Sequence, residues 1–321
     1  MKTNTPLQTQ VISVKKKSFL KDFIRQFDLQ LLVIPGIIFL LIFSYIPMYG
    51  VLMSFQEFQL GDFPGLSKWV GFKHFMIMFT DPNFSIVMRN TIVISLLKLA
   101  INFPIPIVFA ILLNEITSTK FKRSIQTVSY LPHFISWVVA ATLMFDFFSV
   151  DNGAVNTFLQ SLGLISKPVR FFQEGRYFWG MLVGTDIWKE LGWSSIIYIA
   201  TITSIDAELY EAAEVDGAGR FAKMWYITVA GIMPTIVLLL IFTVGNLLNA
   251  NFDQIMMLTN QMGNSMLREY ADVIDTYVYR VGLREARFSF AAAAGLFKSL
   301  INIALLVGAN QLARKTENSV F

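Results

Sequence analysis

The sequence has no cysteine among its 321 residues and only two histidines, His74 and His133. The missing cysteines exclude a disulfide framework, a thiol nucleophile and a cysteine-based metal site. Neither histidine stands in an HExxH or similar metal-binding spacing, so we interpret both as packing or interfacial residues. Charged residues are scarce as well: they make up 15% of the chain, well below the share in an ordinary soluble domain.

Motifs for nucleotide binding and hydrolysis are also missing. The nearest approach to a phosphate-binding loop, residues 295–299, lacks the glycine before Lys298 and lies in an apolar stretch. No hydrolase triad or nucleophile elbow is recognisable. The DNGAVN stretch that begins at Asp151 lacks the alternating acidic positions of a calcium loop and is interpreted as a turn. We therefore expect no catalytic site, no metal site and no cofactor in this chain.

What the chain has in abundance is apolar surface. Hydrophobic residues make up 55% of it, 30 residues are phenylalanine, and the mean hydropathy is +0.56. This composition predicts an integral membrane protein. The net charge of +4 fits positive loops that face anionic lipid, because the apolar spans leave no soluble domain that could bind nucleic acid.

The apolar runs predict an all-α polytopic membrane protein with six transmembrane helices. We place these spans at residues 31–55, 85–113, 125–148, 177–204, 232–250 and 288–312. The first is long enough to span and lacks a cleavage site, so we expect it to stay as a signal anchor. Pro104 and Pro106 predict a broken or kinked second span, and Pro234 is placed in the first turn of the fifth.

Three domains follow from this pattern. Residues 1–28 form a basic, amphipathic N-terminal segment, residues 29–312 the transmembrane domain, and residues 313–321 a short tail. The basic cluster from Lys15 to Lys17 precedes the first span, so the positive-inside rule predicts that both termini are cytoplasmic.

One polar insertion, residues 206–232, interrupts the apolar pattern. Asp206 is placed to cap a helix over Ala207 to Val215, Gly217 and Gly219 permit a sharp break, and a second short helix should begin at Arg220. Its alanines keep the surface small enough for a close approach by another protein. Composition alone favours an ordinary solvated loop helix over such a docking surface.

Charged and polar residues within the predicted spans are candidates for a transport pathway. In the fourth span, Asp186, Lys189 and Glu190 are spaced for mutual pairing on one helix flank, and both self-neutralisation and a pore-lining role stay open. Lys98 lies deep in the second span, where it either serves the pathway or extends its amine to the interface. The other candidates can stack on sugar rings or bond to hydroxyl groups; they are Trp188, Trp193, Tyr198, Asn246, Asn249 and Asn251.

The insertion resembles the EAA loop of type I ABC importer permeases. The matching residues are Glu211-Ala212-Ala213, Asp216-Gly217-Ala218, Trp225 and Ile227-Thr228-Val229. Ala230 stands where that family usually has proline, which indicates a less sharply kinked start of the fifth span. The flanking stretches IWKELGWSSIIYIATITSIDAELYEAAEVDGAGR, NFDQIMMLTN and FSFAAAAGLFKSLIN resemble the carbohydrate branch, the LplB-like permeases, and within it alginate-oligosaccharide permeases.

This resemblance implies a function and a set of partners. Glu211, Ala212, Ala213, Asp216, Gly217 and Ala218 would form the coupling helix that docks on an ATPase subunit. The implied complex contains a second, homologous permease subunit, two ATPase subunits that bind ATP and magnesium, and a periplasmic or lipid-anchored solute-binding protein. Its place is the inner (plasma) membrane of a bacterium, and its cargo an oligosaccharide or polysaccharide.

Two alternatives remain at this point. An ion-gradient-driven secondary transporter would explain Asp186 and Lys189 as a relay, although the sequence shows no internal repeat of the kind many such transporters have. An ABC importer permease for a non-carbohydrate solute is the other alternative.

Overall fold

The computed structural model describes residues 27–314. Most of the predicted N-terminal segment and the end of the predicted tail, residues 1–26 and 315–321, lie outside the described residues. The chain divides into two compact units, with the boundary between Gly50 and Val51.

The first unit contains one apolar helix that begins as α2 (Phe27–Leu40). It continues through a π-helical turn, Leu41–Tyr45, into a 3-10 stretch, Ile46–Phe55, that passes into the second unit. Residues Leu29–Phe55 are long and apolar enough to cross a membrane and match the first predicted span.

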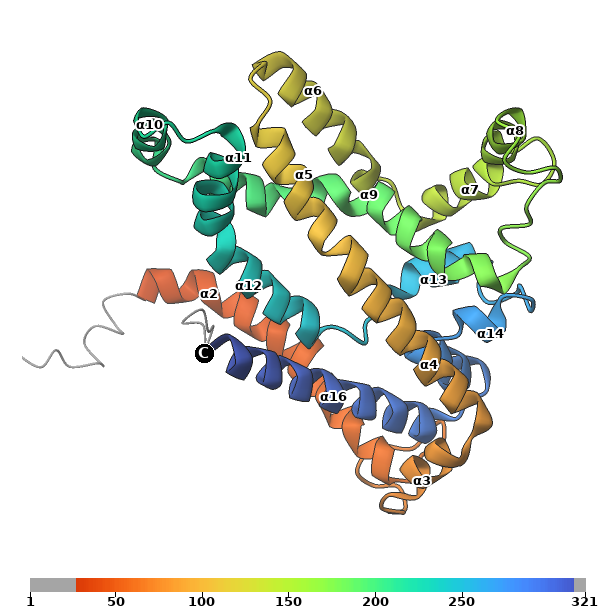
Figure 1. Ribbon diagram of the computed structural model, residues 1–321. Helices are drawn as coiled ribbons and strands as arrows, with labels where there is room; N and C mark the ends of the chain where they lie inside the picture. The colour runs from red at the N-terminus through yellow and green to blue at the C-terminus, as the bar shows by residue number, and fades with distance from the viewer. Residues whose placement is uncertain (1–26, 315–321) are drawn as a thin grey trace, which may run out of the picture. The chain divides into compact units, whose positions relative to one another are not determined.

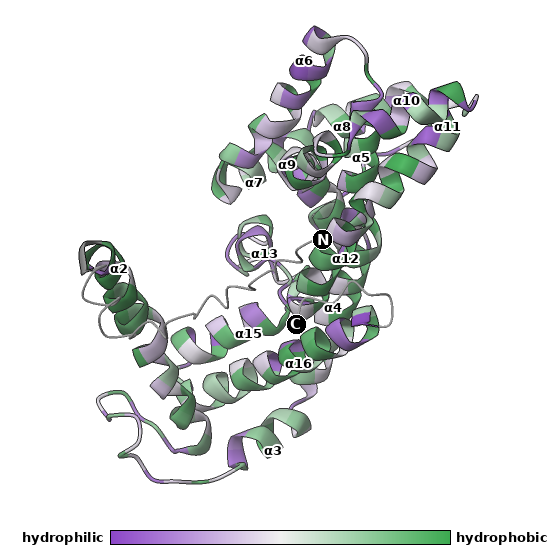
Figure 2. Cartoon of the chain, turned by 90° about the vertical axis from the view of Figure 1, so that its left-hand side faces the viewer, coloured by the Kyte–Doolittle hydropathy of each residue, from purple (hydrophilic) through white to green (hydrophobic). Residues whose placement is uncertain are grey.

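Three long helices of the second unit also have the length and apolar character of membrane spans. They are drawn mainly in the hydrophobic colour in Figure 2. The first comprises α4 (Pro82–Leu97), the π-helical turn Lys98–Asn102 and α5 (Pro104–Asn114). The second comprises α11 (Arg220–Lys223), the π-helical turn Met224–Val229 and α12 (Ala230–Gly245). The third is α16 (Phe288–Arg314).

A further long helix, α9 (Gly175–Thr203), is 29 residues long and carries Asp186, Lys189 and Glu190. Within residues 27–314, four helices qualify as spans, or five if the bent pair α6 and α7 is one span. The chain is thus an all-helical polytopic membrane protein, while the count of six spans stays a prediction.

The predicted third span, residues 125–148, is broken in the structure. Helix α6 (Thr119–Tyr130) runs into a 3-10 turn, Leu131–Phe134, and the chain then bends by 105° into α7 (Trp137–Phe147). Ile135 and Ser136 are extended, and the Ser136 hydroxyl accepts a hydrogen bond from the Val139 amide, which starts the new helix. The break therefore has its own cap.

Proline positions differ from expectation at one site. Pro234 lies inside α12 instead of in a first turn, because the helix already begins at Arg220. A proline cannot donate to the carbonyl four residues earlier, here that of Ala230, and the π-helical turn ends just before that residue. The predicted break of the second span takes the form of the π-helical turn just before Pro104.

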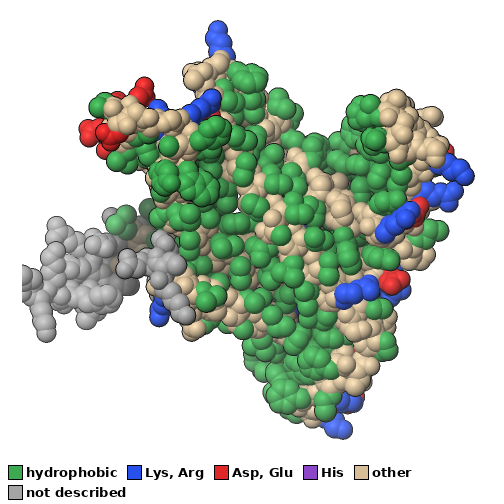
Figure 3. Space-filling view, viewed as in Figure 1, with side chains coloured by type: hydrophobic (Ala, Val, Ile, Leu, Met, Phe, Trp, Pro, Cys, Tyr) green, Lys and Arg blue, Asp and Glu red, His purple; other side chains and the backbone are tan. Residues whose placement is uncertain are grey.

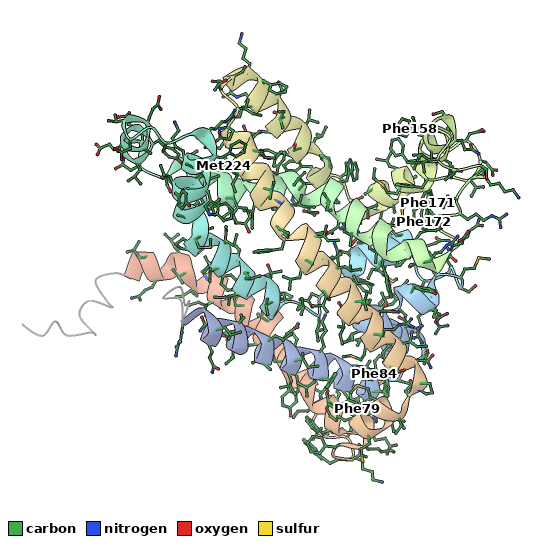
Figure 4. The ribbon with its side chains drawn as sticks, viewed as in Figure 1. Phe79, Phe84, Phe158, Phe171, Phe172 and Met224 are labelled. Carbon is green, nitrogen blue, oxygen red and sulfur yellow. The ribbon has the colours of Figure 1, made fainter. Side chains whose placement is uncertain are left out.

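Three buried clusters hold the second unit together. One joins α7 and α9 to α13 (Phe252–Leu258) and α14 (Arg268–Ala271). Another joins α4 and α16 to α3 (Lys73–Thr80) and α15 (Ile274–Tyr279). Phe79 of α3 packs against Phe84 of this cluster, and the two lie side by side in Figure 4. The third joins α5, α9 and α12, with Met224 packed against it. Helix α8 (Ala154–Ser161) follows α7 in the chain (Figure 1). The π-helical turn Arg280–Arg284 connects α15 to the residues before α16.

A polar clamp fastens α15 to the start of α4. The Tyr277 hydroxyl donates to Asp81 Oδ2 over 2.6 Å. Burial raises the pKa of Tyr277, and the carboxylate of Asp81 raises it further. Burial also tends to raise the pKa of Asp81, but hydrogen bonds from Tyr277 and Asn83 outweigh it and lower that pKa. The clamp therefore keeps Asp81 ionised and Tyr277 protonated at neutral pH.

Gly192 allows α6 and α9 to cross closely, and Gly192→Ala is expected to destabilise the protein. A Cβ at this position would collide with the backbone carbonyl of Ser129, which cannot move independently of its helix. Overpacking of this kind costs about 1–3 kcal/mol. Gly184→Ala on the same helix is the control, because a Cβ there meets nothing within 4 Å and alanine favours a helix. Thermal unfolding in detergent measures the difference, and equal midpoints for the two variants would contradict the close crossing.

Candidate functional site: an exposed short helix and a cavity with a buried ion pair

The polar insertion folds as its local sequence predicts. Helix α10 spans Ala207–Val215, and the Asp206 carboxylate caps it by accepting from the Glu208 amide over 3.0 Å. At the other end Gly217 has φ +77°, a left-handed conformation that suits glycine. The Gly217 amide donates to the Glu214 carbonyl over 3.0 Å, and the Ala218 amide to the Ala213 carbonyl over 2.8 Å. These two bonds form a Schellman motif, which ends the helix sharply.

Helix α10 presents most of its surface to the surroundings. Glu211, Ala212, Asp216 and Gly217 are exposed, whereas Ala213 and Ala218 are intermediate. Val215 is 89% exposed, which is unusual for a branched apolar side chain. Acidic side chains gather over α10 in Figure 3. The acidic residues of this stretch are Asp206, Glu208, Glu211, Glu214 and Asp216.

A few polar contacts connect this helix and the next one to the long helices. The Tyr210 hydroxyl and the Thr228 hydroxyl are 2.9 Å apart, which joins α10 to the π-helical turn before α12. The Arg220 guanidinium binds Glu115 through its carboxylate and donates to its carbonyl over 2.8 Å. These contacts tie α10 and α11 to the C-terminal end of α5 and to the turn before α12.

A cavity of about 710 Å³, mainly apolar but with several polar side chains in its lining, lies between α4, α5, α9 and the C-terminal end of α12. Its size is typical of pockets that take small molecules. Among the predicted pathway residues Asp186, Trp193, Tyr198, Asn246 and Asn249 line it, as do Lys98 and Asn251. The predicted candidates Trp188 and Lys189 are not among its lining residues.

Asp186 is the centre of the charged part of this cavity. Its carboxylate lies 3.4 Å from the Lys98 amine and accepts from the Asn102 amide over 2.6 Å and from the Asn251 amide over 3.3 Å. The side chains of Lys98 and Asp186 are only 14% and 15% exposed. The Lys98 amine also donates to Gln254 Oε1 over 2.6 Å. The pair thus neutralises itself inside a hydrogen-bonded network, as a buried ion pair requires.

The predicted pairing of Asp186 with Lys189 is wrong. Lys189 is 5% exposed, and its amine instead lies 3.0 Å from Glu190 Oε1 and donates to the His133 carbonyl over 2.9 Å. Asp186 takes its partner from another helix, which spacing within α9 could not reveal. Lys98, already a candidate by its depth, is that partner.

Sequence reasoning missed Asn102 and Gln254, which complete the Asp186 network. Asn102 is 84 positions from Asp186, and Gln254 donates to the Leu182 carbonyl over 2.7 Å from 72 positions away. Asn102 belongs to no local motif, and Gln254 lies in the NFDQIMMLTN stretch, whose resemblance to other permeases assigns it no role. A polar residue beside Pro104 in an apolar run was the one available signal for Asn102.

Asn246 and Asn249 stand between two cavities. They line the first and also a second cavity of about 460 Å³, whose other lining residues include Asp275, Lys298, Ser299 and Asn302. Lys298 and Asp275 form an ion pair there. Hydrogen-bonding groups therefore continue across the end of α12 from one cavity to the next.

The protein is an all-helical membrane protein with a cavity between its long helices, and an exposed short helix is joined to two of the helices that line this cavity. As a class, such a protein is a transport permease. Residues 102–318 match the family described as "Binding-protein-dependent transport system inner membrane component". The chain therefore belongs to this family, which confirms the resemblance seen in the insertion.

Similar proteins support the same assignment. The chain is 42% identical over 303 residues to the polygalacturonan/rhamnogalacturonan transport system permease protein YteP of Bacillus subtilis (strain 168), covering 94% of this chain and 92% of that protein. It is 43% identical over 289 residues to protein LplB of the same organism, covering 89% and 88%. A chain in the crystal structure of a bacterial alginate ABC transporter, in complex with alginate pentasaccharide-bound periplasmic protein, is 38% identical with a TM-score of 0.85, over 94% of this chain and 99% of that one.

These findings establish the general role. The chain is a multi-pass inner-membrane permease of a binding-protein-dependent ABC importer, and it works together with a binding protein and further transporter subunits. Permeases of this family are non-catalytic and hold no cofactor; ATP is bound by the ATPase subunits of the system.

Proposed function

We propose that this chain forms half of the translocation pathway for an oligosaccharide or polysaccharide, and that α10 couples this pathway to ATP hydrolysis. The relatives transport polygalacturonan or rhamnogalacturonan in one case and alginate in another, by their names. Asn246 and Asn249 offer neutral groups for sugar hydroxyls, and Trp193 offers a flat face for a sugar ring. An acidic saccharide such as alginate is the specific substrate we propose.

The observation that carries the proposal is how α10 is connected. Helix α9, which contributes Asp186 and Trp193 to the cavity, ends at Thr203, three residues before the cap of α10. The helix that begins at Arg220 runs on into α12, which forms another wall of the cavity. A push on α10 therefore moves two cavity walls, as alternating access requires.

The complex we propose contains a second homologous permease, two ATPase subunits and a solute-binding protein outside the membrane. Helix α10 and both termini lie in the cytoplasm, where closure of the ATP-bound ATPase dimer presses on Glu211, Ala212, Ala213, Asp216, Gly217 and Ala218. A membrane domain of residues 29–312 between two short terminal segments agrees with this arrangement. Lys98 and Asp186 then line the pathway and carry no ion current.

Uptake by the reconstituted complex tests this function. Proteoliposomes that contain the full complex should take up saccharide only with internal ATP and external saccharide-loaded binding protein, and ATP hydrolysis should rise when both are supplied. A panel of alginate, polygalacturonate and neutral oligosaccharides defines the substrate class. Uptake driven by an ion gradient without ATP would contradict the proposal.

A further inference from the structure

The bend between α6 and α7 holds an aromatic pair against the cavity wall. His133, in the 3-10 turn Leu131–Phe134, stacks on Trp193 with ring centroids 4.3 Å apart and ring planes within 1° of parallel. Trp193 lines the cavity and is 48% exposed. His133 is not among the lining residues. The imidazole therefore supports the indole without itself lining the cavity.

Polar contacts from α9 set the orientation of the imidazole. His133 Nδ1 lies 2.6 Å from Glu190 Oε2. The Lys189 amine bridges the two residues, at 3.0 Å from Glu190 Oε1 and 2.9 Å from the His133 carbonyl oxygen. Both carboxylate oxygens of Glu190 and the backbone of the turn are thus engaged, which fixes the ring plane of His133 parallel to Trp193.

The backbone allows this stacking because Gly192 precedes Trp193. With no Cβ at Gly192, the Ser129 carbonyl and the Tyr130 ring approach α9 closely, four and three positions before His133. The same glycine that permits the helix crossing therefore brings the 3-10 turn against the tryptophan.

We propose that His133 is a positioning residue for saccharide transport: it holds the Trp193 indole in the cavity wall so that the ring is ready to pack on a sugar. The inference rests on the proposed saccharide function. An aromatic ring held in place before binding loses less freedom on binding than a mobile one. Glu190 and Lys189 hold His133 in place. Lys189 is a predicted pathway residue, but it contacts the bend and does not line the cavity.

The first test reads the stacking directly. The full complex is labelled with 5-fluorotryptophan, and Trp193→Phe identifies the fluorine resonance of Trp193. His133→Ala should shift and broaden that resonance, while His133→Leu, which fills space without a flat ring, should shift it similarly. Glu190→Gln keeps one of the two acceptor oxygens and should shift the resonance less than His133→Ala does. An unchanged resonance in His133→Ala would overturn the proposal without bearing on transport itself.

The second test asks whether His133 acts through Trp193. At saturating loaded binding protein, His133→Ala and Trp193→Ala should each lower ATP-driven uptake roughly two- to tenfold, the range expected for one lost aromatic contact. The double variant should be no slower than Trp193→Ala alone. His74→Ala is the matched control and should transport normally, because the His74 ring, in α3, contacts the Gln56 carbonyl and lines neither cavity. Multiplying losses in the double variant would overturn the positioning role, whereas absent uptake in the wild-type complex would reject the proposed function.

Discussion

Gly217→Pro is expected to reduce ATP-driven uptake to background while the chain still inserts and assembles. Proline fixes φ near −65°, whereas Gly217 has φ +77°, and proline cannot supply the amide that donates to the Glu214 carbonyl. Helix α10 has nine residues, too few to be stable in isolation, so its ordered form depends on its caps and contacts. Uptake and substrate-stimulated ATP hydrolysis by proteoliposomes measure the loss.

Two variants separate a coupling defect from a general effect of substitution at these glycines. Gly217→Asn should retain much of the activity, because asparagine tolerates the left-handed conformation. Gly219→Ala should leave transport nearly unchanged, since Gly219 has φ −69° and an added Cβ meets nothing within 4 Å.

Glu211→Arg, which reverses an exposed charge without disturbing a helix cap, should also abolish transport. Normal transport in both Gly217→Pro and Glu211→Arg would remove α10 from the coupling pathway.

Asp186→Ala is expected to have the largest effect on stability. The substitution leaves the Lys98 amine without its carboxylate partner where the lysine side chain is 14% exposed. Removal of one partner of a buried ion pair typically destabilises a protein by about 3–5 kcal/mol. The thermal unfolding midpoint of the purified complex and its yield after membrane extraction should both fall.

A compensating variant separates the ion pair from the shape of the side chain. Combining Asp186→Leu with Lys98→Met replaces both charges by apolar groups of similar size and should restore much of the lost thermal stability. The Asn102 and Asn251 amides still lose an acceptor, so recovery should be incomplete. A double variant that is less stable than Asp186→Ala would show that Lys98 is stabilised by Gln254 instead of by the carboxylate.

The parts that sequence predicted well are set by short stretches of chain. Asp206, the helix over Ala207–Val215 and the break at Gly217 all depend on residues within about ten positions of each other. Helix caps and glycine conformations are local properties, so their signals are legible in one sequence. The family pattern in the same stretch then supplied the function that composition could not.

The parts that sequence missed depend on distant residues. Two partners of Asp186, Lys98 and Asn102, lie in the π-helical turn between α4 and α5, and the third, Asn251, follows α12. No spacing rule in the sequence links these positions to Asp186. The bend at Ile135 was missed because an extended residue after a 3-10 turn is not visible in an apolar run that contains only Pro132 as a breaker. The sequence predicts that His133 is a packing or interfacial residue, and its stacking on Trp193 depends on that bend.

The central claim is that α10 transmits the motion of an ATPase to the cavity. Site-specific photo-crosslinking tests it most directly, with a photoreactive side chain in place of Glu211 in the assembled complex. Leu66, which is 83% exposed and lies on the outer side of the membrane in the proposed topology, provides the comparison position. The account predicts a cross-linked product between position 211 and an ATPase subunit, and none between position 66 and that subunit. A complex that hydrolyses ATP but gives no ATPase product from position 211, or gives one from position 66, would contradict it.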